Sequence, residues 1–181
     1  TPSTGAVRTT YYYCVSTLSL GGSGCGTVTT QTAAVIVVGP PTVTTQPTST
    51  QTICVGGTPS SLTMGYSGGT GSATYQWYSN ASNATTGGTA IVGATNASFT
   101  PPALNTAGSY FYYGTVSLNG SGCGSATTGS AEVVVVADPS ISVQPITSQT
   151  VCQNGIPTPI TVTVTGGTGT TTYQWYTTIV N

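Results

Sequence analysis

The segment Tyr75–Tyr78, with the sequence YQWY, recurs letter for letter at Tyr173–Tyr176, 98 residues further along the chain. The two segments hold the only tryptophans of the protein. Successive side chains of a β-strand point to opposite faces, so Tyr75 and Trp77 are predicted to share one face. This alternation is typical of a half-buried strand. We therefore expect each copy of the segment to be a central strand of a β-sheet domain.

The repeat extends far beyond this segment. At the same spacing Leu20 aligns with Leu118, Cys25 with Cys123, Pro41 with Pro139 and Cys54 with Cys152, and upstream Tyr11 aligns with Tyr110 at a spacing of 99. Repetition at this length predicts tandem domains rather than a short-period solenoid. The complete copy is predicted at 42–137, between two short junctions that contain proline. Residues 1–39 are expected to be strands F and G, the C-terminal half of one repeat, and 138–181 strands A, B and C of another.

The charge of the chain is very low. Its 181 residues include one basic and two acidic side chains and no histidine, whereas about a quarter of residues are charged in typical domains. Without basic clusters, nucleic-acid binding is excluded, and no apolar run approaches the 18 residues of a membrane span. The abundance of Val, Thr, Ile and Tyr favours a folded β protein. Near-neutrality favours self-association, so the predicted partner is the protein itself, as a homopolymer or as neighbouring repeats.

Each repeat is predicted to be an immunoglobulin-like β-sandwich without helix, since no segment has a 3.6-residue period. The expected strands are A at 43–52, interrupted by Pro47, B around 62–66, C at 73–78, short strands near 90–92 and 97–100, F at 109–118, and G ending at 133–136. Trp77 should be almost completely buried between the sheets. The predicted core residues are Leu62, Met64, Trp77, Tyr110 and Trp175.

The segment Thr106–Tyr112 resembles the corner between strands E and F of immunoglobulin domains, Asp-Ala-Gly-x-Tyr-x-Cys. In this resemblance Tyr110 is the corner tyrosine and Tyr112 stands where the F-strand cysteine would be. The B-strand cysteine is missing too. We therefore expect aliphatic and tyrosine packing in place of the inter-sheet disulfide.

The sequence segments 51–58, 75–80 and 122–124 resemble the tandem immunoglobulin-like repeats of very large surface proteins of Bacteroidota, including flavobacterial gliding adhesins and extracellular fibres. The resemblance covers nearly the whole chain. It implies an extracellular or cell-surface protein, exported by a type IX-like route, whose repeats act mainly as a stalk.

No constellation of residues indicates catalysis, a cofactor or a metal. Glu132 and Asp138 lie beside a strand end and a linker, and a nucleophile would have no histidine as its base. The cysteines are too dispersed for a metal site, and calcium has no carboxylate cage. Faces rich in tyrosine are the best candidate for a ligand, because such rings stack on sugars. The alternative to a structural protein is therefore a carbohydrate-binding or accessory module of a secreted enzyme.

The cysteines indicate an oxidising, extracellular setting, because four of the five recur as positional pairs. The disulfide candidates are Cys25, Cys54, Cys123 and Cys152, and Cys14 is predicted to be a free thiol. Cys54 pairs most simply with Cys123, but in an immunoglobulin-like repeat these two lie at opposite ends. Bridges across junctions between repeats are therefore favoured. Asn-x-Ser/Thr triplets make possible glycosylation sites of Asn80, Asn83, Asn96 and Asn119.

The two partial repeats suggest a mode of assembly. Each would expose an apolar face and unpaired strand edges. One expectation is that the C-terminal half of one chain packs with the N-terminal half of the next, by strand complementation into a head-to-tail filament. The alternative is that both halves continue into one giant polypeptide of covalent repeats. Either way, we predict a non-enzymatic structural or adhesive module.

Overall fold

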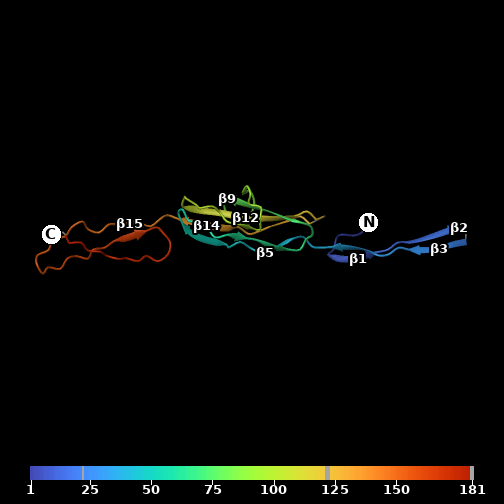
Figure 1. Ribbon diagram of the computed structural model, residues 1–181, viewed down its shortest axis with the longest axis horizontal. Helices are drawn as coiled ribbons and strands as arrows, with labels where there is room; N and C mark the ends of the chain where they lie inside the picture. The colour runs from blue at the N-terminus through green and yellow to red at the C-terminus, as the bar shows by residue number, and fades with distance from the viewer. Residues whose placement is uncertain (22, 121–122, 180–181) are drawn as a thin grey trace.

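The computed structural model describes residues 1–21, 23–120 and 123–179. The regular structure in these ranges is entirely β-strand, as predicted. Within them, no helix is long and apolar enough to cross a membrane. Three bodies lie end to end, with the complete repeat in the middle (Figure 1).

The larger sheet of the central repeat contains strands C, F and G of the prediction. Its strands run in the order β10 (Thr89–Ala90), β9 (Ala73–Asn80), β12 (Gly108–Leu118), β14 (Ala131–Val136) and β6 (Thr50–Cys54), and β13 (Ser125–Thr127) also pairs with β12. The β6–β14 pair is parallel and the other pairs are antiparallel. Hydroxyl-bearing and β-branched residues dominate these strands, as expected for a pleated, half-buried surface.

The facing layer consists of two short strand pairs. These are β5 (Thr42–Thr45) with β8 (Gly65–Ser67), and β7 (Leu62–Thr63) with β11 (Ser98–Phe99). The predicted strand A is thus divided: β5 joins this layer and β6 joins the larger sheet, with Pro47 buried between them. Both parts are edge strands, where a missing backbone N–H is tolerated.

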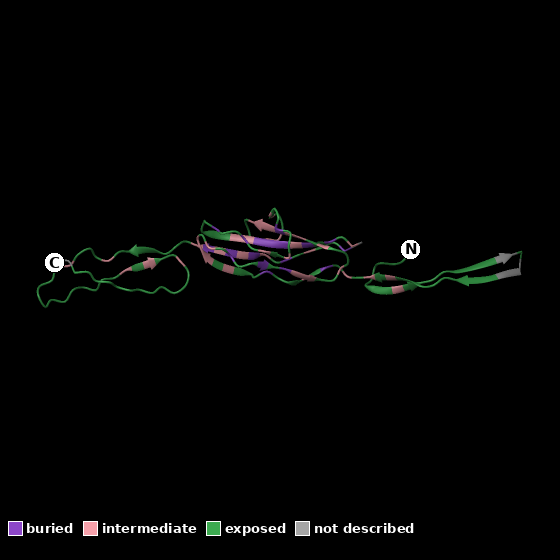
Figure 2. Cartoon of the chain, viewed as in Figure 1, coloured by how far each residue is buried: buried purple, intermediate pink, exposed green. Residues whose placement is uncertain are grey.

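The core lies between the two layers of the central repeat. Trp77 and Leu62 are fully buried there, and Met64 is nearly so. The indole Nε1–H of Trp77 donates to the Asn96 carbonyl at 2.9 Å, so the one polar atom of the ring is satisfied. Buried residues are concentrated in this body (Figure 2). The predicted burial of Trp77 is confirmed.

The corner before strand F has the predicted geometry. The Tyr110 hydroxyl donates to the Thr106 carbonyl at 3.0 Å, which is the hydrogen bond of a tyrosine corner. Tyr112 is buried in the position of the missing cysteine. Burial raises the pKa of Tyr112, and the neighbouring Tyr110 raises it further. These features confirm an immunoglobulin-like β-sandwich.

The first body is the predicted pair of strands F and G. It forms two ladders, β1 (Arg8–Tyr12) with β4 (Ala33–Val37) and β2 (Val15–Leu20) with β3 (Ser23–Thr29). Leu18 pairs with Gly26. In the same way, the Leu118 N–H of the central repeat donates to the Gly124 carbonyl.

This register corrects two alignments made from the sequence. Leu18, not Leu20, takes the place of Leu118. Tyr11 takes the place of Phe111 rather than Tyr110, because Tyr11 pairs with Ala34 as Phe111 pairs with Glu132. The reason is that the segment from Leu18 to Gly26 is two residues longer than the segment from Leu118 to Gly124, which ungapped alignment cannot reveal.

The third body contains strands A and B as predicted, but not strand C. Here β15 (Ser140–Val143) pairs with β16 (Thr163–Thr165), with a bulge at the position of the bulge between β5 and β8. The segment Tyr173–Tyr176 is not a strand, and Trp175 is 53% exposed. The predicted C strand and the core role of Trp175 are therefore wrong here. In the central repeat the equivalent segment pairs with β10 and β12, and nothing in the described third body replaces these partners.

Candidate functional site at the junctions between repeats

The described residues contain no group of three or more His, Cys, Asp or Glu side chains that could hold a metal ion. Glu132 lies on β14, and Asp138 lies in the linker that follows. No described contact brings these two carboxylates together in one cleft. The contacts that the two ends of the central repeat have in common lie at its junctions with the neighbouring bodies.

The first junction is built by a Gly–Gly turn that holds a proline linker. The Gly69 N–H donates to the Gly39 carbonyl at 2.9 Å. Gly68 has φ of 79°, and a Cβ on it would lie 2.9 Å from the Pro40 carbonyl oxygen. Both the left-handed backbone and the close approach require glycine there.

The second junction repeats this arrangement atom for atom. The Gly167 N–H donates to the Ala137 carbonyl at 2.7 Å. Gly166 has φ of 77°, and a Cβ on it would lie 2.6 Å from the Asp138 carbonyl oxygen. Each participant is 98 residues beyond its counterpart. The sequence signal for this contact is that both the Gly–Gly pair and the linker proline (Pro41 and Pro139) recur at the same spacing.

The cysteines of the central repeat lie at opposite ends, one at each junction. The Cys123 thiol is buried, accepts a hydrogen bond from the Thr70 N–H at 3.1 Å, and lines a cavity shared with Val38 of the first body. Cys54 lines a cavity at the second junction together with Pro139 and Thr168. The simple pairing of Cys54 with Cys123 is therefore wrong, because strand polarity separates them.

The described thiols are all free. They are Cys14, Cys54, Cys123 and Cys152, and the side chain of Cys25 lies outside the described part of the structure. Bridges across junctions thus remain a prediction. Cys14 occupies the place of a core glycine: its N–H donates to the Thr30 hydroxyl at 3.0 Å and its carbonyl accepts the Thr30 N–H at 2.9 Å. Gly114 makes the same two hydrogen bonds with Thr128, at 3.0 and 2.8 Å.

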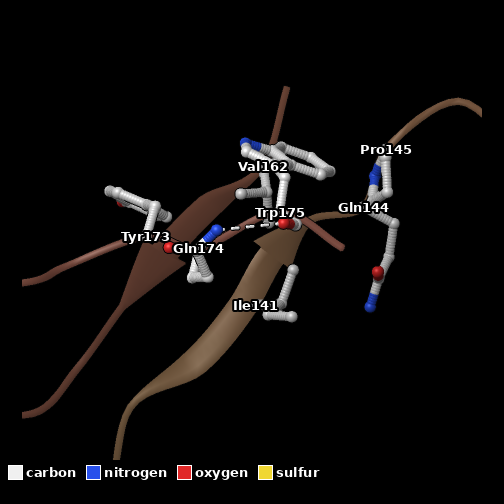
Figure 3. Close-up of a pocket in the computed structure, with 7 residues that line it drawn as sticks. All are labelled: Ile141, Gln144, Pro145, Val162, Tyr173, Gln174 and Trp175. Atoms are coloured by element: carbon white, nitrogen blue, oxygen red, sulfur yellow. Dashed lines mark hydrogen bonds between the residues drawn. The ribbon is translucent and has the colours of Figure 1, made fainter. Parts of the chain in front are cut away.

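The third body carries an open apolar depression (Figure 3). Its lining residues are Ile141, Gln144, Pro145, Val162, Tyr173, Gln174 and Trp175. The Gln174 side-chain amide donates to the Trp175 carbonyl at 3.1 Å, as the Gln76 amide does to the Trp77 carbonyl at 2.8 Å. The two copies of the segment thus share this side-chain hydrogen bond, although only the central copy is a strand and only its tryptophan is buried.

The tyrosines of the central repeat are packed against protein. Tyr78 and Tyr113 stack with ring centroids 4.9 Å apart, and the Tyr113 hydroxyl accepts the Gly88 N–H at 3.2 Å. Tyr113 is buried, so this stack offers a sugar little open ring surface.

The four possible glycosylation sites differ in their surroundings. Asn83, Asn96 and Asn119 are exposed. The Asn80 amide donates to the carbonyls of Ala84 and Thr86, at 3.1 and 3.0 Å. An attached sugar would replace one of the two amide N–H groups and break one of these bonds, so we expect modification only at the exposed three.

The fold and the corner tyrosine define an immunoglobulin-like module. Residues 43–137 match the family described as a domain of unknown function (DUF8696), and the chain belongs to that family. No curated protein matches the chain. Among solved structures it is similar to Sidekick-1 immunoglobulin domains 1-4, crystal form 1, with 14% sequence identity, a TM-score of 0.43 and coverage of 67% of this chain. The chain spans 33% of the length of that solved chain.

Proposed function

We propose that this is a non-enzymatic, extracellular structural protein whose immunoglobulin-like repeats form the stalk of a cell-surface adhesin or the body of a filament. The observation that supports this best is the identity of the two junctions. Gly69 contacts Gly39 as Gly167 contacts Ala137, and Gly68 approaches the linker as Gly166 does.

Equal junctions have a mechanical consequence. When each repeat is related to the next by the same contacts, successive repeats add in one direction, and the prolines of the linkers limit bending. The product is an extended rod. Low charge is compatible with this role, because side-by-side packing of such rods meets little electrostatic repulsion.

Small-angle X-ray scattering of the whole chain tests the rod. We expect a maximum dimension consistent with three bodies in line, as in Figure 1. Gly68→Ala and Gly166→Ala should each loosen one junction, because the new methyl group meets a linker carbonyl. Gly87→Ala is the matched control: Gly87 also has positive φ, but a Cβ there meets nothing within 4 Å.

Two outcomes would contradict the proposal. One is scattering from the unmodified chain that fits freely tumbling bodies. The other is an equal effect of Gly87→Ala and the junction variants.

The carbohydrate-binding alternative rests on exposed aromatic rings, among them Trp175 and Tyr173, which line one depression. Their counterparts Trp77 and Tyr75 belong to the core of the complete repeat, which favours a packing role for these rings over a sugar platform. A glycan array with the whole chain separates the two functions. Binding that is lost in Trp175→Ala would favour the alternative.

A further inference from the structure

The two junctions of this chain show the same joint from its two sides. Gly69 contacts the linker of the first junction as Gly167 contacts that of the second, through one hydrogen bond to a carbonyl each. Cys123 lines a cavity at the first junction, and Cys54 lines a cavity at the second. Together the two junctions therefore show where a cysteine lies on each side of such a joint.

Cys123 lies on the side of the repeat that follows the linker. Its thiol is buried and accepts the Thr70 N–H at 3.1 Å. It lines a cavity of about 370 Å³ together with Val38, which directly precedes the linker residue Gly39. The cysteine at this position therefore faces the preceding body across the junction.

Cys54 lies on the side of the repeat that precedes the linker. It ends β6 and is the Cα partner of Val136 on β14. Its cavity, of about 240 Å³, is also lined by Pro139 and Thr168 of the following body. Both cavities are several times larger than the roughly 30 Å³ that one water molecule occupies. Each therefore has room for a cysteine side chain from the facing repeat.

One link between the two cysteine positions is a threonine. Thr168 lies 98 residues beyond Thr70 and holds the same place in its own repeat. The Thr70 N–H donates to the Cys123 thiol, whereas Thr168 lines the cavity of Cys54. A cysteine that contacts this threonine in the following repeat therefore lies in the cavity of Cys54.

A second link, from different contacts, is a valine. Val136 lies 98 residues beyond Val38 and holds the same place in its own repeat. Val136 is the Cα partner of Cys54, whereas Val38 lines the cavity of Cys123. A strand that pairs with this valine, and ends in a cysteine as β6 does, therefore brings that cysteine to the cavity of Cys123.

We propose that, where two complete repeats of this kind follow each other, the cysteine at the Cys54 position of the first forms a disulfide with the cysteine at the Cys123 position of the second. The inference rests on the proposed structural role, because it describes the joint of the rod, and on the proposed extracellular setting, where disulfides persist. Within one repeat the two positions lie at opposite junctions, so the bridge is made between repeats and not inside one.

The bridge forms by thiol–disulfide exchange with a disulfide oxidant. Two thiols lose two protons and two electrons to give one S–S bond, and the oxidant's disulfide is reduced to two thiols. The new bond connects the two repeats at a second point besides the linker. The joint is then held covalently on two sides, which restrains its bending.

The test uses the whole chain with one exact period added, as residues 1–137 followed by residues 40–181. This protein contains two successive copies of the complete repeat. The complete repeat has both layers and its own buried core, so the duplication adds a folded unit and interrupts none. At the new joint Pro40 follows Ala137, as it follows Gly39 in the original chain.

Two variants of the duplicated chain have the same composition and differ only in which cysteines they keep. In both, every other cysteine is replaced by serine. The bridge variant keeps Cys54 in the first copy and Cys123 in the second, which meet at the new joint. The mirror variant keeps Cys123 in the first copy and Cys54 in the second, which lie at opposite ends of the pair.

Both variants are equilibrated in a buffer of reduced and oxidised glutathione. Alkylation with mass spectrometry then measures the fraction of monomeric protein that holds an intramolecular disulfide. We expect the bridge variant to be bridged at least about tenfold more than the mirror variant, because its two thiols are held at a high effective concentration. Peptide mapping should find Cys54 joined to Cys123, and tryptophan fluorescence should show the same folded state in both variants.

Two results would overturn the inference. One is a bridge variant that stays unbridged although its fluorescence matches that of the mirror variant. The other is equal bridging in the two variants, which would show that the joint does not select the pair. Scattering in the presence of a reductant still measures the rod in either case, so failure here is distinguishable from failure of the proposed function.

Discussion

Gly114 on β12 lies against Met64 and Trp77 in the core of the complete repeat, and this close packing can be tested directly. Gly114→Ala adds one methyl group that would overlap the Met64 Cε. Overpacking of this kind costs about 1–3 kcal/mol. The loss of glycine's freedom in the unfolded chain offsets about 0.4–1 kcal/mol. We therefore expect Gly114→Ala to lower the free energy of unfolding by about 1–2 kcal/mol.

The compensating change is Met64→Val. Met64 is 6% exposed, and shortening it leaves a small cavity at a cost of about 1–2 kcal/mol. In the double variant the new methyl group enters this cavity, so both penalties shrink together. The two changes should then cost at least about 1 kcal/mol less than the sum of the single changes.

Equilibrium unfolding in urea, followed by tryptophan fluorescence, measures all four proteins. Trp77 is fully buried and Trp175 is already 53% exposed in the folded chain, so the fluorescence change reports mainly on the complete repeat. Additive effects, within about 0.5 kcal/mol, would refute the reasoning.

Three further predictions concern the complete repeat. Trp77→Ala should lower the free energy of unfolding by about 3–5 kcal/mol, measured by circular dichroism in urea, whereas an effect below about 1 kcal/mol would place the ring outside the core. Tyr110→Phe should cost about 1 kcal/mol by removing the hydrogen bond to Thr106, and unchanged stability would show that the corner adds nothing. The raised pKa of Tyr112 stabilises the folded state fully below the unfolded pKa of about 10, and this contribution is lost as pH rises through the folded value. Tyr112→Phe should therefore flatten the loss of stability above pH 10, and an unchanged alkaline profile would contradict this.

Much of the complete repeat is predictable from local pattern. Alternation around Trp77 predicts its strand and its buried face, and the Tyr110 motif predicts the corner hydrogen bond. Both signals are local because strand faces alternate with period two and the corner bond spans only four residues. The polarity of an immunoglobulin-like sandwich also predicts that Cys54 and Cys123 lie at opposite ends, as the structure confirms.

Other features depended on contacts between distant segments. The sequence repeats YQWY exactly, yet Trp77 is buried and Trp175 is exposed, because burial is set by the strands that pack on a residue and not by the residue itself. The register that sets Cys14 in the place of Gly114 depends on backbone hydrogen bonds across a hairpin, which ungapped alignment misses.

The amino-acid sequence by itself therefore determined the β-sandwich fold, the length of the repeat and the central strand, because these follow from side-chain alternation and repetition. Only the tertiary structure decided which tryptophan is buried, which glycines contact the linker carbonyls, and which residues lie opposite each other on paired strands. Those properties depend on the distances between segments far apart in sequence, and packing fixes such distances only when the whole repeat is assembled.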